Sequence, residues 1–268
     1  MTPKLIATDF DGTLVRGDYT VSARTNKVLK ELSARGVIIV GITGRGPRLR
    51  QLCQTDLPSA HYLVLGQGGF VYRVTGDDTA ETLHETFIDG ERAAEAVELI
   101  ERQTGPVQVL VENGIKHEAT LVGDPFEDWP WRVPMVACPR AESLSGPIVK
   151  AFIRSADIPA PLLLTRARAL VPTELASLTD AGVGNVEICP PGVNKDVGLS
   201  RVAERLGISP EDTIVFGDAE NDLTMFGWAG HAVAVANAHP QVRAAADAFT
   251  SSNDDDGVAV YLERLYGL

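Results

Sequence analysis

The sequence lacks clustered cysteines and long apolar runs, and each absence excludes a class of protein. Its three cysteines, Cys53, Cys138 and Cys189, lie far apart, whereas a zinc site or a disulfide framework needs cysteines that are clustered or evenly paired. We therefore expect buried free thiols in a reducing compartment. No apolar run reaches the roughly 20 residues needed to cross a bilayer, so we expect no membrane partner.

Positive charge is also scarce. The chain has 24 Lys and Arg against 36 Asp and Glu, for a formal net charge of -12. Nucleic-acid binding depends largely on Lys and Arg side chains that neutralise backbone phosphates, so we expect no nucleic-acid partner. A small phosphorylated ligand stays compatible with this balance, because a bound metal and a few cations can set the local charge.

The N-terminus leads straight from Met1-Thr2-Pro3-Lys4 into a strand-like run. It lacks the apolar region and cleavage site of a signal peptide, and we therefore expect a cytoplasmic protein. The apolar fraction of 44% and the charged fraction of 22% are typical of a globular protein with a packed core. A chain of 268 residues can hold one large domain or two ordinary ones.

The first 65 residues alternate between short apolar runs and amphipathic stretches. Runs of apolar and β-branched residues stopped by polar residues or glycine predict buried strands. A capping serine before an apolar stripe, and a glycine after it, predict a helix. These rules give a strand at 5–8, a helix from Ser22 to Gly36, a strand at 37–42, a helix at 47–53 and a strand at 62–65.

The C-terminal third has the same alternation. Leu199, Val202, Ala203 and Leu206 form the apolar stripe of an amphipathic helix that Gly207 ends. Further signals give a strand at 213–216, a helix at 222–228, a strand at 231–235 and a helix at 257–265. Alternating strands and helices predict an α/β fold with a doubly wound parallel sheet, like that of Rossmann folds.

The middle of the chain has a different pattern. It predicts a helix through Ala93 and Ile100, strands at 107–112, 114–121 and 148–154, and helices at 160–169 and 173–181. Paired strands separated by helices indicate an α+β unit. We therefore predict a discontinuous core, residues 1–84 and 188–268, with an inserted α+β cap domain, residues 85–187, since insertion is tolerated where chain ends lie close together at the surface.

Three of the predicted strands end in polar residues that a core does not need. The first is followed by Asp9 and Asp11, the second by Thr43, Gly44 and Arg45, and the strand at 213–216 by Asp218, Asn221 and Asp222. In open parallel sheets, ligands bind outside the carboxyl ends of the strands. We therefore expect these side chains to line one crevice.

Four acidic residues in one crevice predict a cation. Asp9 and Asp11 are two residues apart, so their side chains leave the same face of an extended chain, and close carboxylates need a shared proton or a shared cation. Asp218 and Asp222 add to the negative charge. Mg²⁺ fits a site with few protein oxygens plus water and phosphate, whereas the five scattered histidines do not favour zinc.

The motifs resemble those of the haloacid dehalogenase (HAD) superfamily, and more closely its Cof-type, type IIB capped phosphatases. They are DFDGTLV from Asp9, TGR from Thr43, Lys195 before a helix, and GDAENDLTMF from Gly217, in that order. The segments 235–238 and 252–259 are also similar to the closing segments of that subfamily, so the resemblance covers both flanks of the chain.

The resemblance implies a role for each motif residue. Asp9 would attack phosphorus and form an aspartyl-phosphate, and Asp11 would act as general acid and base. Asp9, the main-chain carbonyl of Asp11, and Asp218 would ligate Mg²⁺, and Asn221 and Asp222 would complete or orient that shell. Thr43, with the amide of Gly44, would hold a phosphoryl oxygen. Lys195 would offset the charge of the phosphate and of Asp9.

Each motif also has a purely structural interpretation. The first two aspartates could cap a helix, Thr43-Gly44 could be an ordinary turn, and Asp222 could be a helix N-terminal acid. Lys195 could be a surface lysine, because Asp196 stands where the family usually has glycine. Arg45 could contact phosphate or form a structural ion pair.

Three further segments depart from the motifs or lie outside them. Gln67-Gly68-Gly69 departs from the family's common Asn-Gly-Ala, and Gln67 is therefore left out of the predicted site. Trp129, Trp131 and Arg132 could form a sugar-stacking platform or simply pack in the inserted unit. The run 254–256 of three aspartates is interpreted as a solvated turn that caps the last helix.

The predicted function is Mg²⁺-dependent hydrolysis of a small phosphate monoester, a sugar phosphate or related metabolite. The inserted unit would exclude water and select the leaving group. A phosphomutase on the same scaffold and a catalytically silent ligand-binding relative are the alternatives. The sequence makes no prediction of oligomeric state.

Overall fold

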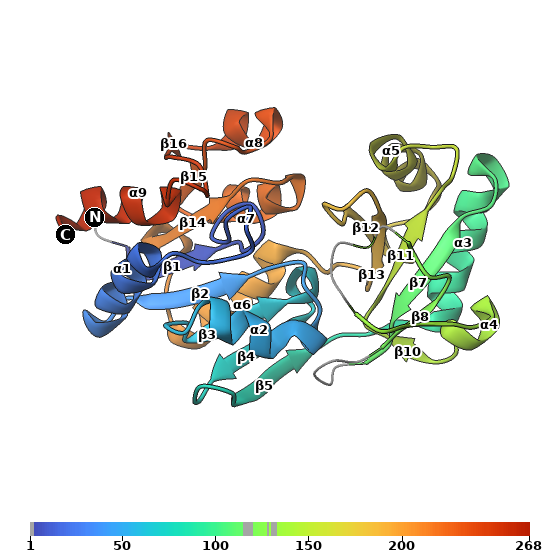
Figure 1. Ribbon diagram of the computed structural model, residues 1–268, viewed down its shortest axis with the longest axis horizontal. Coiled ribbons are helices and arrows are strands. Elements are labelled where there is room, and N and C mark those ends of the chain that lie inside the picture. The colour runs from blue at the N-terminus through green and yellow to red at the C-terminus, as the bar shows by residue number, and fades with distance from the viewer. Residues whose placement is uncertain (1–2, 115–119, 128, 130–132) are drawn as a thin grey trace. The chain divides into compact units, whose positions relative to one another are not determined.

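The chain folds into two compact units. A computed structural model describes residues 3–114, 120–127, 129 and 133–268 (Figure 1). Unit 1 comprises Met1–Thr43, Arg50–His84 and Asn194–Leu268, and unit 2 comprises Gly44–Leu49 and Glu85–Val193. Each unit has its own sheet and its own apolar core.

Unit 1 is built on an eight-stranded sheet in the order β16-β15-β14-β1-β2-β3-β4-β5. All neighbouring strands from β16 to β3 are parallel, and β4 is antiparallel to β3. The strands are β1 (Leu5–Thr8), β2 (Ile38–Ile42), β3 (Tyr62–Leu65), β4 (Phe70–Val74), β5 (Ala80–Glu85), β14 (Thr213–Gly217), β15 (His231–Ala234) and β16 (Ala248–Phe249). The predicted doubly wound α/β fold is confirmed, and the strand order switches direction at β1.

Helices cover both faces of this sheet. They are α1 (Ala23–Ala34), α2 (Arg50–Asp56), α6 (Lys195–Leu206), α7 (Leu223–Trp228), α8 (Pro240–Ala245) and α9 (Gly257–Tyr266), with 3-10 turns η2 (Gly66–Gly68), η3 (Pro210–Asp212) and η4 (Glu220–Asp222). Val215 belongs to the same apolar cluster as Leu199 of α6. Its neighbour Phe216 points to the other face and contacts the ring of Tyr261 in α9. A parallel sheet buried on both faces explains why its strands are almost wholly apolar.

The sequence signals for the helices of unit 1 act as expected. Ser22 is the N-cap of α1, and its hydroxyl accepts a hydrogen bond from the Thr25 amide at 3.0 Å. Gly207 ends α6 in the left-handed conformation. The expected strands at 5–8 and 62–65 match β1 and β3, and the other expected elements of unit 1 shift by only a few residues.

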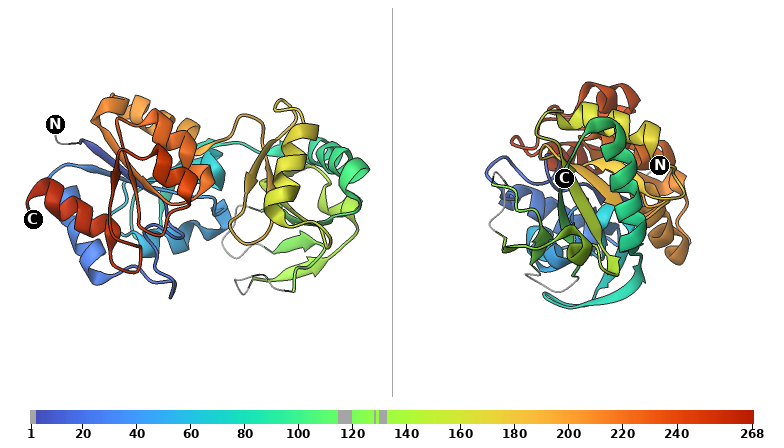
Figure 2. Two further views of the ribbon diagram at one scale, coloured as in Figure 1. Left: turned by 90° about the horizontal axis from the view of Figure 1, so that it is seen from above. Right: turned by 90° about the vertical axis from the view of Figure 1, so that its right-hand side faces the viewer.

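Unit 2 contains a six-stranded sheet in the order β12-β13-β11-β7-β8-β9 and the small pair β10-β6. The strands are β6 (Ile88–Asp89), β7 (Gln108–Glu112), β8 (Leu121–Gly123), β9 (Met135–Ala137), β10 (Pro147–Ile148), β11 (Lys150–Arg154), β12 (Ser177–Asp180) and β13 (Val186–Cys189). Helices α3 (Gly90–Thr104) and α5 (Ala160–Leu170) cover one face of the larger sheet (Figure 2), and α4 (Arg140–Ser143) and the turn η1 (Pro47–Leu49) complete the unit.

The other face of this sheet carries buried charges. Lys150 forms an ion pair with Glu187, and its Nζ donates a hydrogen bond to the Gly44 carbonyl at 2.7 Å. Arg48 of η1 lies 3.5 Å from Glu112. The side chains of all four charged residues are at most 4% exposed. They form a network of two cations and two carboxylates, which we call the unit 2 ion cluster.

One predicted helix of unit 2 is wrong. The segment expected to be helical at 173–181 contains strand β12, which pairs antiparallel with β13. Gly182 and Gly184 adopt positive φ in the connecting turn, and this hairpin adds an edge strand to the sheet, outweighing the local helical spacing of Leu175 and Leu178. Most of the predicted strand at 114–121 falls outside the described residues.

Two further expectations concern the whole chain. Cys53, Cys138 and Cys189 are free thiols; Cys53 and Cys189 are buried as predicted, whereas Cys138 is only partly buried. Among the residues that the structure describes, no helix combines the length and the apolar character needed to cross a bilayer.

Candidate active site

Three neighbouring parallel strands of unit 1 end beside one another. Thr8 at the end of β1 is in register with Gly41 of β2 on one side and with Phe216 of β14 on the other. Figure 1 shows β1 between these two strands. Asp9, Thr43 and Asp218 follow the three strands directly, so the structure places these predicted site residues at one edge of the sheet, at the switch in strand order.

Lys195 joins two of the acidic motifs. Its Nζ donates to Asp9 Oδ1 and to Asp222 Oδ1, both at 2.6 Å. The three side chains are at most 7% exposed, and Lys195 is the first residue of α6. The surface-lysine interpretation is therefore wrong: the ammonium is buried between two carboxylates.

Asp222 also fixes the turn that carries Asp218. Its Oδ2 accepts hydrogen bonds from the amides of Asp218 at 2.9 Å and Ala219 at 3.0 Å. Asp218 Oδ1 in turn accepts from the Thr13 hydroxyl at 2.7 Å. Both oxygens of Asp222 are thus bound by donors of this chain, which holds Lys195 and the Asp218 turn in one rigid arrangement.

Two glycines make the close approaches of this site possible. Gly12 has φ 83°, and a Cβ there would lie 2.4 Å from Asp218 Oδ2. Gly68 has φ 107°, and a Cβ there would lie 2.1 Å from the Asn194 carbonyl at the start of α6. Side chains at these positions would displace Asp218 and Lys195 respectively, so both glycines are required by geometry.

Burial shifts the pKa values of the site most, and its charged side chains come next. Burial, with Asp222 as the next cause, raises the pKa of Asp218 to about 6, and Asp11 adds to that rise. Burial also raises the pKa of Asp9 despite the opposing charge of Lys195. Burial alone would lower the pKa of Lys195, but Asp222 and Asp9 outweigh it and hold that pKa above its ordinary value.

The acidic cluster has the chemistry of a site for a hard cation. Oxygens of Asp9, Asp218 and Asp222 lie within 4.8 Å of one another. Asn221 Oδ1 is buried, with no hydrogen-bond partner among the described residues. Carboxylate and amide oxygens are the donors that Mg²⁺ and Ca²⁺ prefer, so these residues fit the predicted ion.

The remaining predicted residues are divided between the units. Asp11 lies close enough to Asp218 to influence its pKa, and Thr43 is almost fully buried. Gly44 and Arg45 belong to unit 2, where the Gly44 carbonyl accepts from Lys150 and Arg45 is 9% exposed. Contact of these two residues with a phosphate stays a prediction.

The structure adds polar residues that were not predicted for the site. Gln67 Oε1 accepts a hydrogen bond from Asn221 Nδ2 at 3.1 Å. Asn237 Nδ2 donates to the Gly12 carbonyl at 2.7 Å, and its Oδ1 accepts from the Asn253 amide at 3.0 Å. For Asn237 and Asn253, the only sequence signal was the similarity of segments 235–238 and 252–259 to the family's closing segments. Gln67 was left out of the predicted site because it departs from the family's motif.

The remaining interpretations from sequence have mixed outcomes. Asp256 occupies the N-cap position of α9, but it makes no side-chain cap bond and instead pairs with Arg16 at 2.6 Å. Trp129 packs against Phe152 with ring centroids 4.8 Å apart, which supports the packing interpretation for this residue. Trp131 and Arg132 lie outside the described residues.

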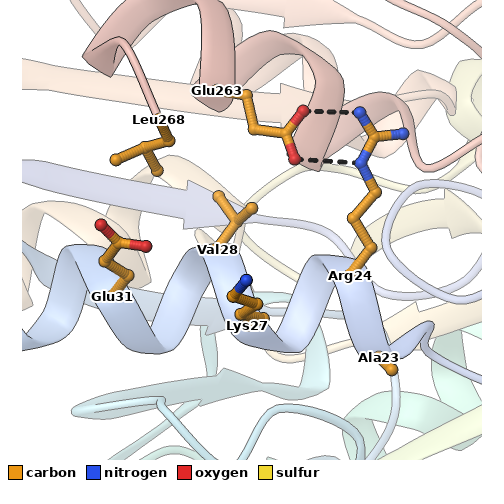
Figure 3. A pocket seen from close by; sticks show the side chains of 7 residues that line it. All are labelled: Ala23, Arg24, Lys27, Val28, Glu31, Glu263 and Leu268. Carbon is orange, nitrogen blue, oxygen red and sulfur yellow. Dashed lines mark hydrogen bonds and ion pairs between the residues drawn. The ribbon is translucent and has the colours of Figure 1, made fainter.

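A surface groove of about 410 Å³ lies elsewhere on unit 1. Its lining comes from α1, α9 and Leu268, and Figure 3 shows Arg24 of α1 paired with Glu263 of α9 beside it. None of the predicted site residues lines this groove. The candidate reaction site is therefore the edge of the sheet and not this groove.

Known proteins resemble this chain over almost its whole length. The profile of the haloacid dehalogenase-like hydrolases matches residues 6–262. The chain is 27% identical to the 5-amino-6-(5-phospho-D-ribitylamino)uracil phosphatase YitU of Bacillus subtilis, over 99% of this chain and 98% of that protein. It is 29% identical to the phosphoglycolate phosphatase of Archaeoglobus fulgidus, over 98% of this chain and 97% of that protein.

A solved structure has the same fold. The HAD subclass IIB sugar phosphatase BT4131 matches with a TM-score of 0.79 and 21% identity, over 98% of this chain and 99% of that one. At that identity the likeness is one of fold, and it extends over both units of the chain.

Proposed function

The chain belongs to the haloacid dehalogenase-like hydrolase family, and from that premise we propose that it is a Mg²⁺-dependent phosphatase that works through an aspartyl-phosphate on Asp9. The enzyme class, a phosphoric monoester hydrolase, follows from the family and from relatives that are named phosphatases. The metal, the intermediate and the substrate are the parts that we propose.

The observation that carries the proposal is the buried Asp9–Lys195–Asp222 arrangement. The Lys195 ammonium, 2.6 Å from Asp9 Oδ1, orients that carboxylate. It also opposes the rise in the pKa of Asp9 that burial causes, and so favours the ionised form that a nucleophile requires. It also supplies positive charge where a phosphoryl group would bring negative charge. In this arrangement one ammonium lies between two carboxylates, and Asp9 directly follows β1 at the edge of the sheet where ligands bind in this class of fold.

The reaction would proceed in two displacements. In the first, an oxygen of Asp9 attacks phosphorus, the bond from phosphorus to the leaving oxygen breaks, and Asp11 gives that oxygen a proton. In the second, Asp11 takes a proton from water, the water oxygen attacks phosphorus, and Asp9 is released with inorganic phosphate. Each proton transfer by a positioned carboxyl group contributes typically about 10²–10⁴-fold.

Further residues of the motifs would hold the phosphoryl group. Thr43 and the amide of Gly44 would bind a phosphoryl oxygen, and Arg45 would add a contact to phosphate. Lys195 would stabilise the charge that spreads over the equatorial oxygens in the transition state. These roles depend on position and charge, because phosphoryl transfer leaves little covalent chemistry for the protein to perform.

Mg²⁺ would be held by the carboxylates of Asp9 and Asp218 and by the main-chain carbonyl of Asp11. When bound, it would neutralise charge on the phosphoryl oxygens. Both oxygens of Asp222 already accept hydrogen bonds, which favours an orienting role for this residue. Asn221, with its buried Oδ1, would complete the shell around the ion.

The predicted core and the predicted cap would have different roles. We propose that residues 1–84 and 188–268 form the catalytic core and that residues 85–187 form a cap that selects the leaving group. The relatives act on different compounds by name, a phosphoribityl uracil and phosphoglycolate. The substrate proposed here is therefore a small phosphorylated metabolite of the sugar-phosphate type, in a cytoplasmic setting.

The test combines a substrate panel with acid-quench trapping. Phosphorylated sugars and metabolites labelled at the phosphate are assayed for kcat/KM with Mg²⁺, and quenched enzyme is digested and mapped for labelled Asp9. We expect labelled protein at Asp9 and free labelled phosphate as product. Label that passes only into another sugar would identify a mutase, and label on another residue, or none under burst conditions, would overturn the nucleophile assignment.

A further inference from the structure

Gln67 has an unfavourable backbone conformation in a buried place. It follows β3 within the η2 turn, with φ 60° and ψ 20°, and it is only 4% exposed. A left-handed conformation costs a residue with a side chain roughly 1–2 kcal/mol, and Asn or Gly tolerates it better than Gln does. Strain of this kind persists where the surroundings require it and is concentrated at functional sites.

The surroundings of Gln67 connect two motifs of the proposed site. Its amide donates to the Thr43 carbonyl at 3.1 Å, and its side-chain Oε1 accepts from Asn221 Nδ2 at 3.1 Å. Thr43 follows β2, and Asn221 lies in η4, directly after the turn that carries Asp218. One residue in a strained conformation thus bonds to both of these segments of unit 1.

The Asn221 carboxamide is satisfied at one end only. Its Nδ2 is bound by Gln67, while its Oδ1 is buried and has no hydrogen-bond partner in the described part of the chain. A buried acceptor without a donor costs about 1–3 kcal/mol, and such atoms are rare in folded proteins. An oxygen of this kind is explained when a ligand of the site supplies its partner.

In the arrangement that the structure has, the oxygen end of the Gln67 carboxamide faces Asn221. With Gln67 Oε1 as acceptor, only Nδ2 can face it, so the oxygen is left for the ligand. An oxygen suits a metal ion or a metal-bound water, whereas an amide NH₂ would repel the ion.

We propose that Gln67 is a positioning residue that orients Asn221 so that Oδ1 serves the metal shell of the acidic cluster. The inference rests on the proposed function, since it gives Gln67 a role in the same Mg²⁺ site. It adds a residue outside the acidic motifs, and it gives the strained turn after β3 a function.

The variant that tests it is Gln67→Met, which keeps the length of the side chain and removes the acceptor. Partners in the outer shell of a metal site typically contribute about 10–100-fold to metal affinity or activity. We expect the dissociation constant for Mn²⁺, measured by electron paramagnetic resonance on the substrate-free protein, to rise by about 10-fold. We expect kcat with a phosphate ester to fall by a similar factor. Gln241→Met makes the same change at an exposed position of unit 1 and should leave both values unchanged.

A double-mutant cycle shows whether Gln67 acts through Asn221. Asn221→Ala removes the group that Gln67 is proposed to orient, so adding Gln67→Met to it should have no further effect on Mn²⁺ binding. If Gln67→Met lowered the Mn²⁺ affinity by the same factor with and without Asn221, Gln67 would act independently of Asn221, and the proposal would be overturned. Wild-type Mn²⁺ affinity in Gln67→Met would overturn it as well.

A second variant covers the case in which Gln67→Met does not fold. Gln67→Gly accepts the positive φ without strain and keeps the amide bond to Thr43, and it should show the same loss and the same dependence on Asn221. The wild-type protein separates this inference from the proposed function. If wild-type protein neither binds Mn²⁺ nor hydrolyses phosphate esters, the proposed function fails; if it does both and the cycle is additive, only the role of Gln67 fails.

Discussion

The two units each bury a cluster of charged side chains, and the clusters differ in their ratio of cations to carboxylates. In unit 2, Arg48 and Lys150 face Glu112 and Glu187, so cations and carboxylates are equal in number. In unit 1, the Lys195 ammonium pairs with both Asp9 and Asp222, and Asp222 and Asp11 lie close enough to Asp218 to raise its pKa. Among the ion pairs given for the described residues, the first cluster has one carboxylate for each cation, whereas in the second two carboxylates share one ammonium.

The difference separates a structural network from a site that needs a ligand. Buried charges are tolerated when they are paired, and an excess of one sign raises or lowers pKa values until it is relieved. Burial is the largest cause of the raised pKa values of Asp9 and Asp218, and neighbouring carboxylates add to both. Burial also raises the pKa of Glu112, but there both Arg48 and Lys150 oppose the rise. The unit 2 ion cluster needs no added ion, and the following changes test that contrast.

The largest expected effect is the loss of the nucleophile. Asp9→Asn removes the attacking oxygen while keeping the shape of the side chain, and kcat with p-nitrophenyl phosphate should fall by at least about 10⁴-fold. Steady-state kinetics at saturating Mg²⁺ measure this. Asp157→Asn, at an exposed position of unit 2, is the matched control. Retention of more than a tenth of the wild-type kcat in Asp9→Asn would contradict the mechanism.

Removal of one cation from each cluster should destabilise both units, but with different responses to Mg²⁺. Lys150→Met leaves Glu187 without its cation, and breaking a buried pair costs about 3–5 kcal/mol. Added Mg²⁺ should not restore the thermal midpoint of this variant. Lys195→Met should lose a comparable amount, and Mg²⁺ should restore part of it.

Scanning calorimetry of both variants, with and without Mg²⁺, makes the comparison. The double replacement Lys150→Met with Glu187→Leu should recover most of the stability, because it removes both members of the pair. If Mg²⁺ restored the thermal midpoint of Lys150→Met, the unit 2 ion cluster would also be able to take up a cation, and the proposed difference between the two clusters would be wrong.

Metal removal should abolish activity and should lower the stability of the folded protein by less than the loss of a buried cation does. EDTA should abolish phosphate release, and Mg²⁺ should restore it. Mg²⁺ at about 100 times its dissociation constant should stabilise the folded protein by about 2.7 kcal/mol. Asp218→Asn should lose that stabilisation, and Asp157→Asn should keep it. Full activity in EDTA would exclude the proposed metal.

The smallest expected effect is on the pH dependence of the metal-free protein. Folding raises the pKa of Asp218 from its ordinary value to about 6. The stability linked to its protonated form is therefore present below the ordinary value and lost as pH rises through about 6. In EDTA, the free energy of unfolding of Asp218→Asn minus that of wild type should therefore rise by about 2 kcal/mol between about pH 4 and pH 7. Urea unfolding measures this difference, and a flat difference would contradict the assignment.

The sequence predicted the parts of the fold that depend on local patterns. The strand Leu5–Thr8, the Ser22 cap and the glycine after Leu206 are short-range signals, and the structure has each of them. The helix expected at 173–181 is wrong because its residues are recruited to the sheet by pairing with β13, a contact that local spacing does not encode.

The same distinction applies to the site. Asp9, Thr43 and Asp218 could be predicted because each follows a recognisable strand. The contact between Gln67 and Asn221 joins residues 154 positions apart, and it depends on the left-handed conformation of Gln67. A departure from the family's motif appeared to exclude this residue from the site, although its side chain reaches a motif asparagine.

The position of β1 has a consequence for how the protein is made. This strand lies between β2 and β14, and its partner in β14 is about 200 residues further along the chain. During synthesis the N-terminal segment must therefore wait with one edge unpaired until nearly the whole chain has left the ribosome. Contacts of such sequence separation slow folding and leave strand edges open to aggregation. Chaperone dependence and intolerance of C-terminal truncation are thus expected of this nucleophile-bearing strand, for reasons unrelated to its chemistry.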